Sequence, residues 1–354
     1  MAQPDDMIYM RRCLELAGRA EGCTAPNPMV GAVVVHDDVV IGEGYHLRAG
    51  TPHAEVHALN AVKDRSLLPN STIFVSLEPC SHHGRTPPCA DLIISSGIRR
   101  VVVGTTDTSL KVAGRGIARL REAGIEVVTG VMEEESRRIN RRFFTWHEKQ
   151  RPWVVLKWAR SADGYIDLER KEGETPEPHW ITGTTERILV HRWRAAEDAI
   201  LAGGGTVRAD NPSLDVRLWK GKNPLRVIVS RSGAMDPASR VFDGATDTVL
   251  FTCNEKVSLP GTRIIKLADN QYFIEEVLNA LHAMGIQSLF VEGGAFIISH
   301  FVETGLWDEA RRFTGGIKFG GGVPDPFPGF RPEESVRFEK SILEIMYHFN
   351  GISV

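Results

Sequence analysis

Short apolar runs alternate with amphipathic segments through the first half of the chain, and this pattern predicts an α/β domain. Apolar residues recur at helical spacing over residues 6–20, while branched apolar runs at 30–36 and 39–41 predict two strands. Asp37 and Asp38 separate these runs, so we expect a hairpin there. The same reasoning predicts further strands at residues 72–77, 101–104 and 125–129, and helices after Pro52 to about residue 62 and at residues 86–96, 116–123 and 132–146.

The pattern is interrupted at residues 147–152, which are polar and end in a proline. We place a domain boundary there, with one domain over residues 1–147 and a second over residues 151–354. The second domain repeats the alternation of strands and helices. Its predicted strands lie at residues 153–157, 199–202, 226–230, 248–252, 263–266 and 288–291, its helices at 184–196 and 274–284, and its loops at 169–178 and 319–330.

Two strands of the second domain run directly into glycines and then into a helix. Gly203, Gly204 and Gly205 follow one strand, and Gly293 and Gly294 follow another. This layout presents backbone N–H groups to a phosphate, although the second glycine pair also suits a plain turn. The dinucleotide motif Gly-x-Gly-x-x-Gly is absent, so the sequence does not indicate an ordinary Rossmann domain.

The composition is that of a soluble globular protein, with 354 residues, 42% of them hydrophobic and 25% charged. The N-terminus has neither a basic start nor an apolar run, and no apolar stretch reaches the length of a membrane span. We therefore expect a cytoplasmic protein without a membrane partner. Five cysteines do not suggest a disulfide framework and fit a reducing compartment. We expect Cys13, Cys23 and Cys253 to be small buried hydrophobic residues.

The charge distribution gives no sign of a polyanionic partner. The formal net charge is −3, and residues 1–150 hold equal numbers of basic and acidic side chains. Because no basic field surrounds this half, a nucleic-acid substrate is disfavoured and a small-molecule substrate is favoured.

The first domain contains a pattern of metal-binding residues: His53, Glu55, Cys80 and Cys89. One imidazole and two thiolates form a zinc set with its fourth position open, and iron would also accept these donors. Zinc lowers the pKa of water to about 7 and so activates it as hydroxide. Glu55, which is not a ligand in this scheme, would move the proton to the departing amine. The pattern predicts a zinc-dependent deaminase.

The segment between the two cysteines is rich in hydrogen-bond donors. Arg85 and Thr86 could hold a substrate phosphate there. His82 or His83 could instead complete a closed structural zinc site, but Glu55 would then have no role. A nucleic-acid-binding zinc protein is the alternative from another functional class, and the neutral first half disfavours it.

These motifs closely resemble the RibD family, which joins a pyrimidine deaminase to a reductase for riboflavin biosynthesis. The resemblance is dense in the first half, through residues 26–31, 42–46, 53–59, 77–89 and 112–116. It is thinner in the second half, through residues 163–164, 180–182, 194, 206–207, 210–214, 217 and 291–294.

The resemblance implies a cytidine-deaminase-like three-layer α/β/α domain followed by a dihydrofolate-reductase-like α/β domain. It implies zinc-dependent deamination of 2,5-diamino-6-ribosylamino-pyrimidinone 5′-phosphate, followed by reduction of the ribosyl group to ribityl by NADPH. The expected cofactors are Zn²⁺ and NADPH, and a homo-oligomer, a dimer or a tetramer, is expected. The alternative is a deaminase whose C-terminal half is degenerate or serves as a scaffold.

The family motifs also imply roles for individual residues. Asn27 and His46 would hold the pyrimidine, although Asn27 also suits a turn and His46 a surface position. Lys157 and Glu292 are candidates for the acid of the reductase. The implied NADPH contacts are Trp180, Thr206, Asp210 and Gly294, and the implied substrate contacts are Arg194, Leu214, Arg217 and Glu292. A solvated or ion-paired helix face is the alternative for Arg194, and core packing is the alternative for Trp180.

The second half departs from the family pattern in several places. Arg160 stands where a small residue is usual, and we expect it to meet a cofactor phosphate. Pro178 stands where a serine often meets substrate. The segment Ala310–Arg311–Arg312–Phe313–Thr314 replaces an apolar strand, so the detailed geometry of the reductase site does not follow from the sequence.

Overall fold

The computed structural model describes residue 3 and residues 5–81, 87–109, 113–169, 178–271 and 273–348. It divides into two compact units, the first ending at Gln150 and the second beginning at Arg151. Arg85 and Thr86 lie outside the described residues. Within the described part, no helix combines the length and the apolar character needed to cross a membrane.

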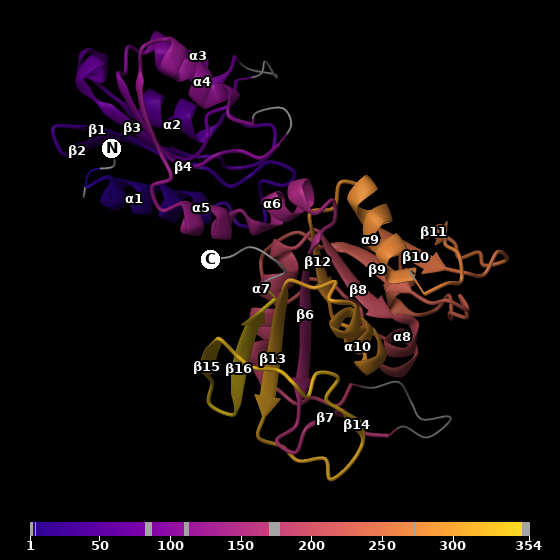
Figure 1. Cartoon of the computed structure of the whole chain (residues 1–354). Helices are drawn as coiled ribbons and strands as arrows, with labels where there is room; N and C mark the ends of the chain where they lie inside the picture. The colour runs from indigo at the N-terminus through magenta and orange to yellow at the C-terminus, as the bar shows by residue number, and fades with distance from the viewer. Residues whose placement is uncertain are drawn as a thin grey trace. The chain divides into compact units, whose positions relative to one another are not determined.

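The first unit is built on a five-stranded sheet in the order β2-β1-β3-β4-β5 (Figure 1). Strands β1 to β3 pair antiparallel, and β3, β4 and β5 run parallel. Asp37 and Asp38 both have positive φ, as the predicted hairpin between β1 and β2 requires. The strands are β1 Gly31–His36, β2 Val39–Tyr45, β3 Thr72–Leu77, β4 Arg100–Thr105 and β5 Glu126–Thr129.

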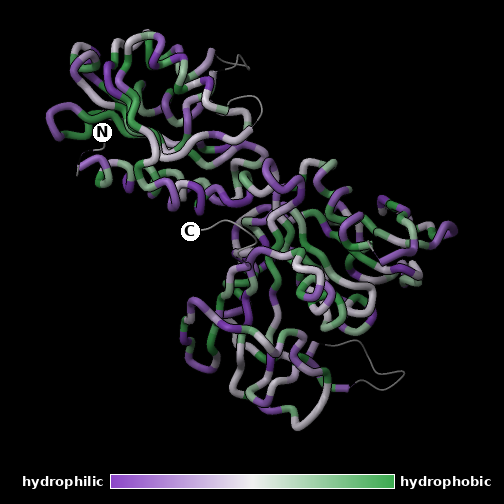
Figure 2. Tube along the Cα trace, in the orientation of Figure 1, coloured by the Kyte–Doolittle hydropathy of each residue, from purple (hydrophilic) through white to green (hydrophobic). Residues whose placement is uncertain are grey.

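Helices cover both faces of this sheet, which gives the predicted three-layer α/β/α arrangement. Cys13 and Leu16 of α1 pack with Phe74 on one face, whereas Ala58 of α2 and Ile93 of α3 pack on the other. Figure 2 shows the hydrophobic residues concentrated in the strands between these layers. The helices are α1 Asp6–Gly18, α2 Ala54–Ala61, the 3-10 helix η1 Arg65–Asn70, α3 Cys89–Ser95, α4 Arg115–Glu122, α5 Glu133–Ile139 and α6 Arg141–Glu148.

The second unit is built on a nine-stranded sheet in the order β11-β10-β9-β8-β12-β6-β13-β16-β15. The first seven strands of this order, from β11 through to β13, run parallel. Strand β16 pairs antiparallel with β13, and β15 pairs antiparallel with β16. A separate short pair joins β7 Tyr165–Asp167 to β14 Val323–Pro324. The sheet strands are β6 Trp153–Arg160, β8 Ala199–Gly203, β9 Leu225–Val229, β10 Thr248–Thr252, β11 Arg263–Lys266, β12 Ser288–Val291, β13 Glu309–Gly315, β15 Glu334–Arg337 and β16 Ser341–Tyr347.

Helices also cover both faces of the larger sheet. Val277 of α9 and Phe301 of α10 pack against one face, and Val190 of α7 packs against the other. Each unit therefore has its own core and is an α/β fold, as predicted. The helices are α7 Thr184–Ala196, α8 Gly204–Asp210, the 3-10 helix η2 Arg240–Phe242, α9 Phe273–Ala283 and α10 Ala295–Thr304.

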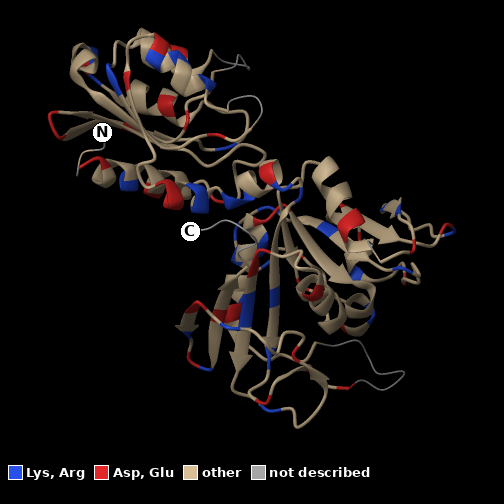
Figure 3. Ribbon diagram, viewed as in Figure 1, with Lys and Arg blue, Asp and Glu red and all other residues tan. Residues whose placement is uncertain are grey.

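Three sequence predictions need correction. The helix predicted over residues 132–146 is two helices, α5 and α6, because the helical path breaks at Asn140. Cys13 is buried as expected, but Cys23 is exposed and Cys253 is only partly buried. The charged segment at residues 310–314 is a central part of β13, where Figure 3 shows basic positions within the sheet.

Candidate active sites

Three side chains of the first unit converge as a candidate metal centre. His53 directly precedes α2, Cys80 follows β3, and Cys89 opens α3. The Nδ1 atom of His53 lies 3.6 Å from the Cys80 Sγ and 3.3 Å from the Cys89 Sγ. Zinc bonds of about 2.0–2.3 Å at tetrahedral angles separate ligand atoms by about 3.5 Å. The donor set and its spacing therefore fit a zinc ion with one open position.

Glu55 lies in the first turn of α2, two residues beyond His53, and its side chain is buried. Burial, together with the nearby Cys80 thiolate, raises the pKa of Glu55 to about 7. A carboxyl group of this kind can accept and return a proton near neutral pH. His82 and His83, the candidates for a fourth ligand, lie outside the described residues.

The predicted pyrimidine-binding pair lies beside the metal set. The Nδ2 atom of Asn27 is 3.1 Å from the Nε2 atom of His46, whose other ring nitrogen is 3.2 Å from the Pro52 carbonyl oxygen. The His46 ring meets the His53 ring edge to face at 5.4 Å. His46 is only 2% exposed, so the surface position considered for it is wrong, and burial lowers its pKa.

The second unit holds a pocket at the point where its strand order reverses. In the sheet, β8, β9 and β12 lie on one side of β6, whereas β13 lies on its other side. The chain changes sides between β12 and β13. At such a point, the carboxyl ends of neighbouring parallel strands open a crevice for ligands. The pocket has a volume of about 910 Å³, and Lys157 and Glu292 line it. Four of the five residues predicted to contact NADPH also line it: Trp180, Thr206, Asp210 and Gly294.

Glycines shape the floor of this pocket. A Cβ atom at Gly203 or Gly293 would come within 2.9 or 3.0 Å of the Ile297 side chain, so glycine lets α10 pack closely against β8. The backbone N–H of Gly294 donates to the Thr206 hydroxyl at 2.8 Å, which joins the starts of α8 and α10. The glycines are therefore part of a built crevice rather than a plain turn.

Trp180 stands at the rim of the pocket and is 54% exposed. The Arg187 guanidinium lies 4.7 Å from the centre of its ring. Core packing, the alternative considered for Trp180, is therefore wrong. Pro178, the departure from the family serine, also lines the pocket.

A buried ion-pair cluster borders the pocket, whose lining includes Lys157 and Glu292. Arg194 binds Glu292 in a bidentate manner, at 2.6 and 2.9 Å, and the Lys157 ammonium lies 3.9 Å from the same carboxylate. Burial alone would raise the pKa of Glu292, but the charges of Arg194 and Lys157 outweigh it and lower that pKa to about 2. Burial lowers the pKa of Lys157, and Glu292 offsets this only in part.

Two predicted substrate residues lie near this cluster but do not line the pocket. Leu214 is 2% exposed and packs in the core beside α7. Arg217 is half-exposed and pairs with Asp215, whose carbonyl oxygen accepts a hydrogen bond from Arg194 at 2.9 Å. The segment carrying Leu214 and Arg217 is thus attached to the Arg194–Glu292 pair. Arg194 itself is ion-paired with Glu292, as the alternative interpretation of this residue expected.

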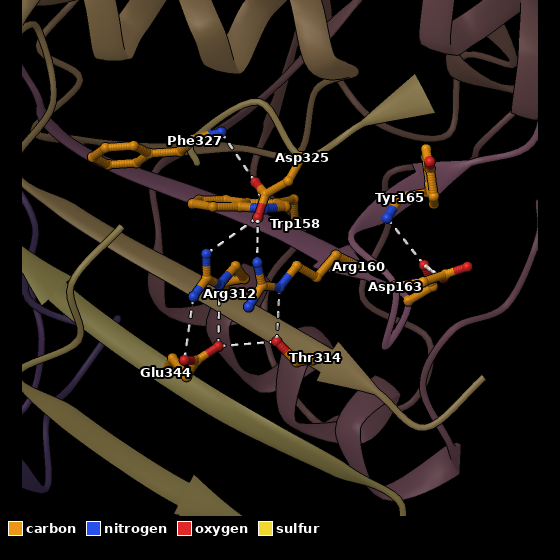
Figure 4. A network of polar contacts seen from close by, with 10 residues as sticks. Trp158, Arg160, Asp163, Tyr165, Arg312, Thr314, Asp325, Phe327 and Glu344 are labelled. Carbon is orange, nitrogen blue, oxygen red and sulfur yellow. Dashed lines mark hydrogen bonds and ion pairs between the residues drawn. The ribbon is translucent and has the colours of Figure 1, made fainter. Parts of the chain in front are cut away.

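Arg160 is placed differently from the prediction. Its guanidinium donates to Asp325 at 3.0 Å and to the Thr314 hydroxyl at 3.1 Å, on the sheet face shown in Figure 4. It is not among the residues that line the pocket. Arg160 therefore binds protein side chains and not the cofactor phosphate that the sequence suggested.

Sequence reasoning missed residues that support the sites from a distance. Asn140 binds both backbone polar groups of Met29, and Asp325 binds Trp158 in the pocket wall. Neither residue belongs to a short motif. Glu78, whose carboxylate accepts a hydrogen bond from the Gly116 backbone N–H, was also missed. It lies two residues before Cys80 within the Leu-Glu-Pro-Cys motif, and this position was a signal for a supporting role.

Comparison with known proteins identifies a known domain in each unit. Residues 3–105 match the cytidine and deoxycytidylate deaminase zinc-binding region, and residues 152–343 match the RibD C-terminal domain. The riboflavin biosynthesis protein RibD of Bacillus amyloliquefaciens is 41% identical over 88% of this chain and 85% of its own length. That of Escherichia coli is 37% identical, with 86% of each protein covered.

Solved structures give the same result. A diaminohydroxyphosphoribosylaminopyrimidine deaminase/5-amino-6-(5-phosphoribosylamino)uracil reductase from Thermotoga maritima is 38% identical, with a TM-score of 0.87, and the match covers 97% of this chain and 99% of that one. RibD from Acinetobacter baumannii is 30% identical, with a TM-score of 0.85 and coverage of 98% and 99%.

The fold and the two sites define a bifunctional enzyme of small molecules, a zinc-dependent deaminase joined to an NADPH-dependent reductase. The chain belongs to the RibD family of riboflavin biosynthesis. Both domains are present, so a degenerate or purely scaffolding C-terminal half is not supported.

Proposed function

We propose that the protein catalyses two consecutive steps on one pyrimidine nucleotide. The first is deamination of 2,5-diamino-6-ribosylamino-pyrimidinone 5′-phosphate, and the second is reduction of its ribosyl group to ribityl by NADPH. The observation that carries this proposal is the convergence of His53, Cys80 and Cys89 beside Glu55 in a unit joined to a second unit with a large crevice. The names of the full-length relatives support both steps.

In the first step, water adds to the ring carbon that bears the amino group, the C–N bond breaks, and ammonia leaves as a carbonyl forms. A zinc ion held by His53, Cys80 and Cys89 would supply the Lewis acidity that activates the water. Glu55 accepts the proton of the water and delivers it to the departing nitrogen. Asn27 and His46 hold the ring edge. Arg85 and Thr86 remain candidates for the substrate phosphate.

In the second step, the sugar ring is open and its first carbon is double-bonded to nitrogen. NADPH, when bound in the crevice, would supply the hydride that this carbon takes up, and the electron pair of the double bond would move to the nitrogen. A nearby acid must then protonate the nitrogen. Because Glu292 is ionised and paired with Arg194, we assign this role to Lys157, whose pKa is lowered toward the working pH. Glu292 then fixes the position of the Lys157 ammonium.

Trp180, Thr206, Asp210 and Gly294 line the crevice and are the proposed contacts of NADPH. For the substrate we propose Arg194, Leu214, Arg217 and Glu292. Of these, Arg217 has a half-exposed side chain and suits a sugar phosphate, because a guanidinium binds phosphate oxygens in pairs. Arg194 and Leu214 would act indirectly, by holding in place the segment that carries Arg217.

The decisive experiment measures the two steps separately. The purified protein is given the diaminopyrimidinone nucleotide, and ammonia release and NADPH oxidation are followed independently. Glu55→Gln should abolish ammonia release while the zinc content stays stoichiometric, and it should still oxidise NADPH when given the deaminated nucleotide. Ammonia release by the Glu55→Gln variant at the wild-type rate would refute the assignment of Glu55.

The family resemblance also supports a homo-oligomer, a dimer or a tetramer, in the cytoplasm. Sedimentation velocity at several protein concentrations tests the first point. A monomer across the whole range would contradict it.

A further inference from the structure

Asp325 accepts hydrogen bonds from four donors in the second unit. One carboxylate oxygen accepts from the Trp158 indole N–H at 3.0 Å and from the Phe327 backbone N–H at 3.0 Å. The other accepts from Arg160 at 3.0 Å and from Arg312 at 3.1 Å. Figure 4 shows this carboxylate between the indole ring and the two guanidinium groups. Its side chain is only 7% exposed.

The network around Asp325 is balanced in charge. Arg312 also binds Glu344 at 3.1 and 3.2 Å, and the Thr314 hydroxyl joins Arg160 to Glu344. The strand residues come from the paired strands β6, β13 and β16. Two guanidinium groups therefore face two carboxylates, which is the condition for keeping buried charges stable. The two departures from the family pattern, at residues 160 and 310–314, belong to this one network.

Asp325 also attaches a loop to the pocket. Its backbone N–H donates to the Gly164 carbonyl at 2.9 Å, and the nearby Val323 lines the pocket together with Trp158. Phe327 stacks on the Trp158 ring, with centroids 6.4 Å apart and an interplanar angle of 28°. The Asp325 carboxylate thus joins two parts of the same pocket wall.

We infer that Asp325 is a positioning residue of the reductase: it fixes Trp158 and residues 323–327 as a wall of the NADPH pocket without touching the cofactor itself. The inference rests on the proposed binding of NADPH in this pocket. The Trp158 ring has one polar atom, and Asp325 holds it. Loss of this bond leaves the buried indole N–H without its acceptor, so we expect the ring and residues 323–327 to shift at the pocket wall.

The test is the variant Asp325→Asn, which keeps the size of the side chain but removes its charge and replaces one acceptor oxygen by a donor. We expect the Kd for NADPH, measured by titration of NADPH fluorescence, to rise about fivefold to tenfold. Ammonia release by the first unit should stay at the wild-type rate and provides an internal control for concentration and folding.

Asp308→Asn is the matched control. Asp308 is also a buried carboxylate paired with an arginine, Arg151, but it lies at the start of β6 and β13, at the opposite end of the strands from the pocket. This variant should lose thermal stability and bind NADPH with the wild-type Kd. If Asp325→Asn and Asp308→Asn gave equal stability losses and both kept that Kd, Asp325 would be purely structural and the inference would be wrong.

Trp158→Phe tests the route of the effect. It keeps an aromatic ring but removes the indole N–H, so it should raise the Kd for NADPH, and its combination with Asp325→Asn should be less than additive. Full additivity would show that Asp325 does not act through Trp158. Failure of the wild-type protein to bind NADPH would instead overturn the proposed cofactor site, so the two failures are distinguishable.

Discussion

At the scale of single residues, Asn140 shows how one residue can set a site that it does not touch. It stands between α5 and α6 and is 3% exposed. Its amide accepts a hydrogen bond from the Met29 backbone N–H at 2.7 Å and donates to the Met29 carbonyl at 2.8 Å. Met29 follows Asn27 by two residues. The same amide therefore holds the break between two helices and the segment that presents Asn27.

Asn140→Asp should weaken pyrimidine binding while leaving the metal in place. Aspartate can still accept from the Met29 N–H, but its second oxygen would face the Met29 carbonyl oxygen, so the segment should shift. We expect KM for deamination to rise about tenfold, because one buried hydrogen bond is lost and repulsion replaces it. Ammonia release over a range of substrate concentrations measures this change.

Asn60→Asp is the control for Asn140→Asp, because Asn60 is exposed on α2 and its side-chain oxygen accepts a hydrogen bond from Arg65 at 3.1 Å. It should leave KM and zinc content unchanged. An Asn140→Asp variant with wild-type KM would show that the Met29 contact does not control the pyrimidine site.

At the scale of elements, the metal centre depends on contact between the end of β3 and the start of α4. Glu78 follows β3, and its carboxylate accepts hydrogen bonds from the backbone N–H groups of Gly116 at 2.8 Å and Ile117 at 3.2 Å, in the first turn of α4. A carboxylate there also complements the positive end of the helix dipole. Because Glu78 lies two residues before Cys80, α4 supports a metal ligand.

Gly116→Ala should disturb this contact severely. A Cβ at Gly116 would lie 1.9 Å from the Pro79 carbonyl oxygen, so either α4 or the turn that carries Cys80 must move. We expect a stability loss of about 2 kcal/mol, typical of an overpacked site, and faster transfer of zinc to a chromogenic chelator. Gly18→Ala is the control, since the nearest atom to its Cβ is an Ile139 methyl at 3.8 Å. Equal zinc release rates for the two variants would refute the proposed support.

Local signals explain which elements the sequence predicts well. The strand at 72–77 and the helix at 184–196 have the predicted bounds, because their apolar periodicity is complete within a few residues. The break at Asn140 depends on Met29, 111 residues away, and no periodicity reveals it. The burial of Arg312 in β13 likewise requires Asp325 and Glu344, which become its neighbours only in the folded protein.

The same distinction holds for the sites. His53, Glu55, Cys80 and Cys89 could be identified because metal chemistry restricts both residue type and spacing. The residues that support the wall of the reductase pocket, such as Asp325, could not be identified from the sequence, because their partners come from distant segments. Arg160 is the clearest case: a lone arginine near a nucleotide site suggests a phosphate contact, but Asp325 is its partner, 165 residues away.

At the scale of the whole molecule, the protein joins two chemistries that use different cofactors. The metal ligands all belong to the first unit, and the pocket belongs to the second. Each unit has a hydrophobic core of its own. The division falls between Gln150 and Arg151, close to the boundary predicted from sequence, and we propose that each unit folds independently.

Metal removal should therefore act on one unit only. A ligand that binds the native state stabilises it by an amount that grows with its concentration relative to Kd, so chelation should lower the melting temperature of the first unit. Ammonia release should fall to zero and return when zinc is restored. The reductase should keep its rate with the deaminated nucleotide, because His53, Cys80 and Cys89 all belong to the first unit. Calorimetry with and without chelator, together with the two separate assays, checks each part. Parallel loss of NADPH oxidation would show that the second unit depends on the folded first unit, and the proposed independence would fail.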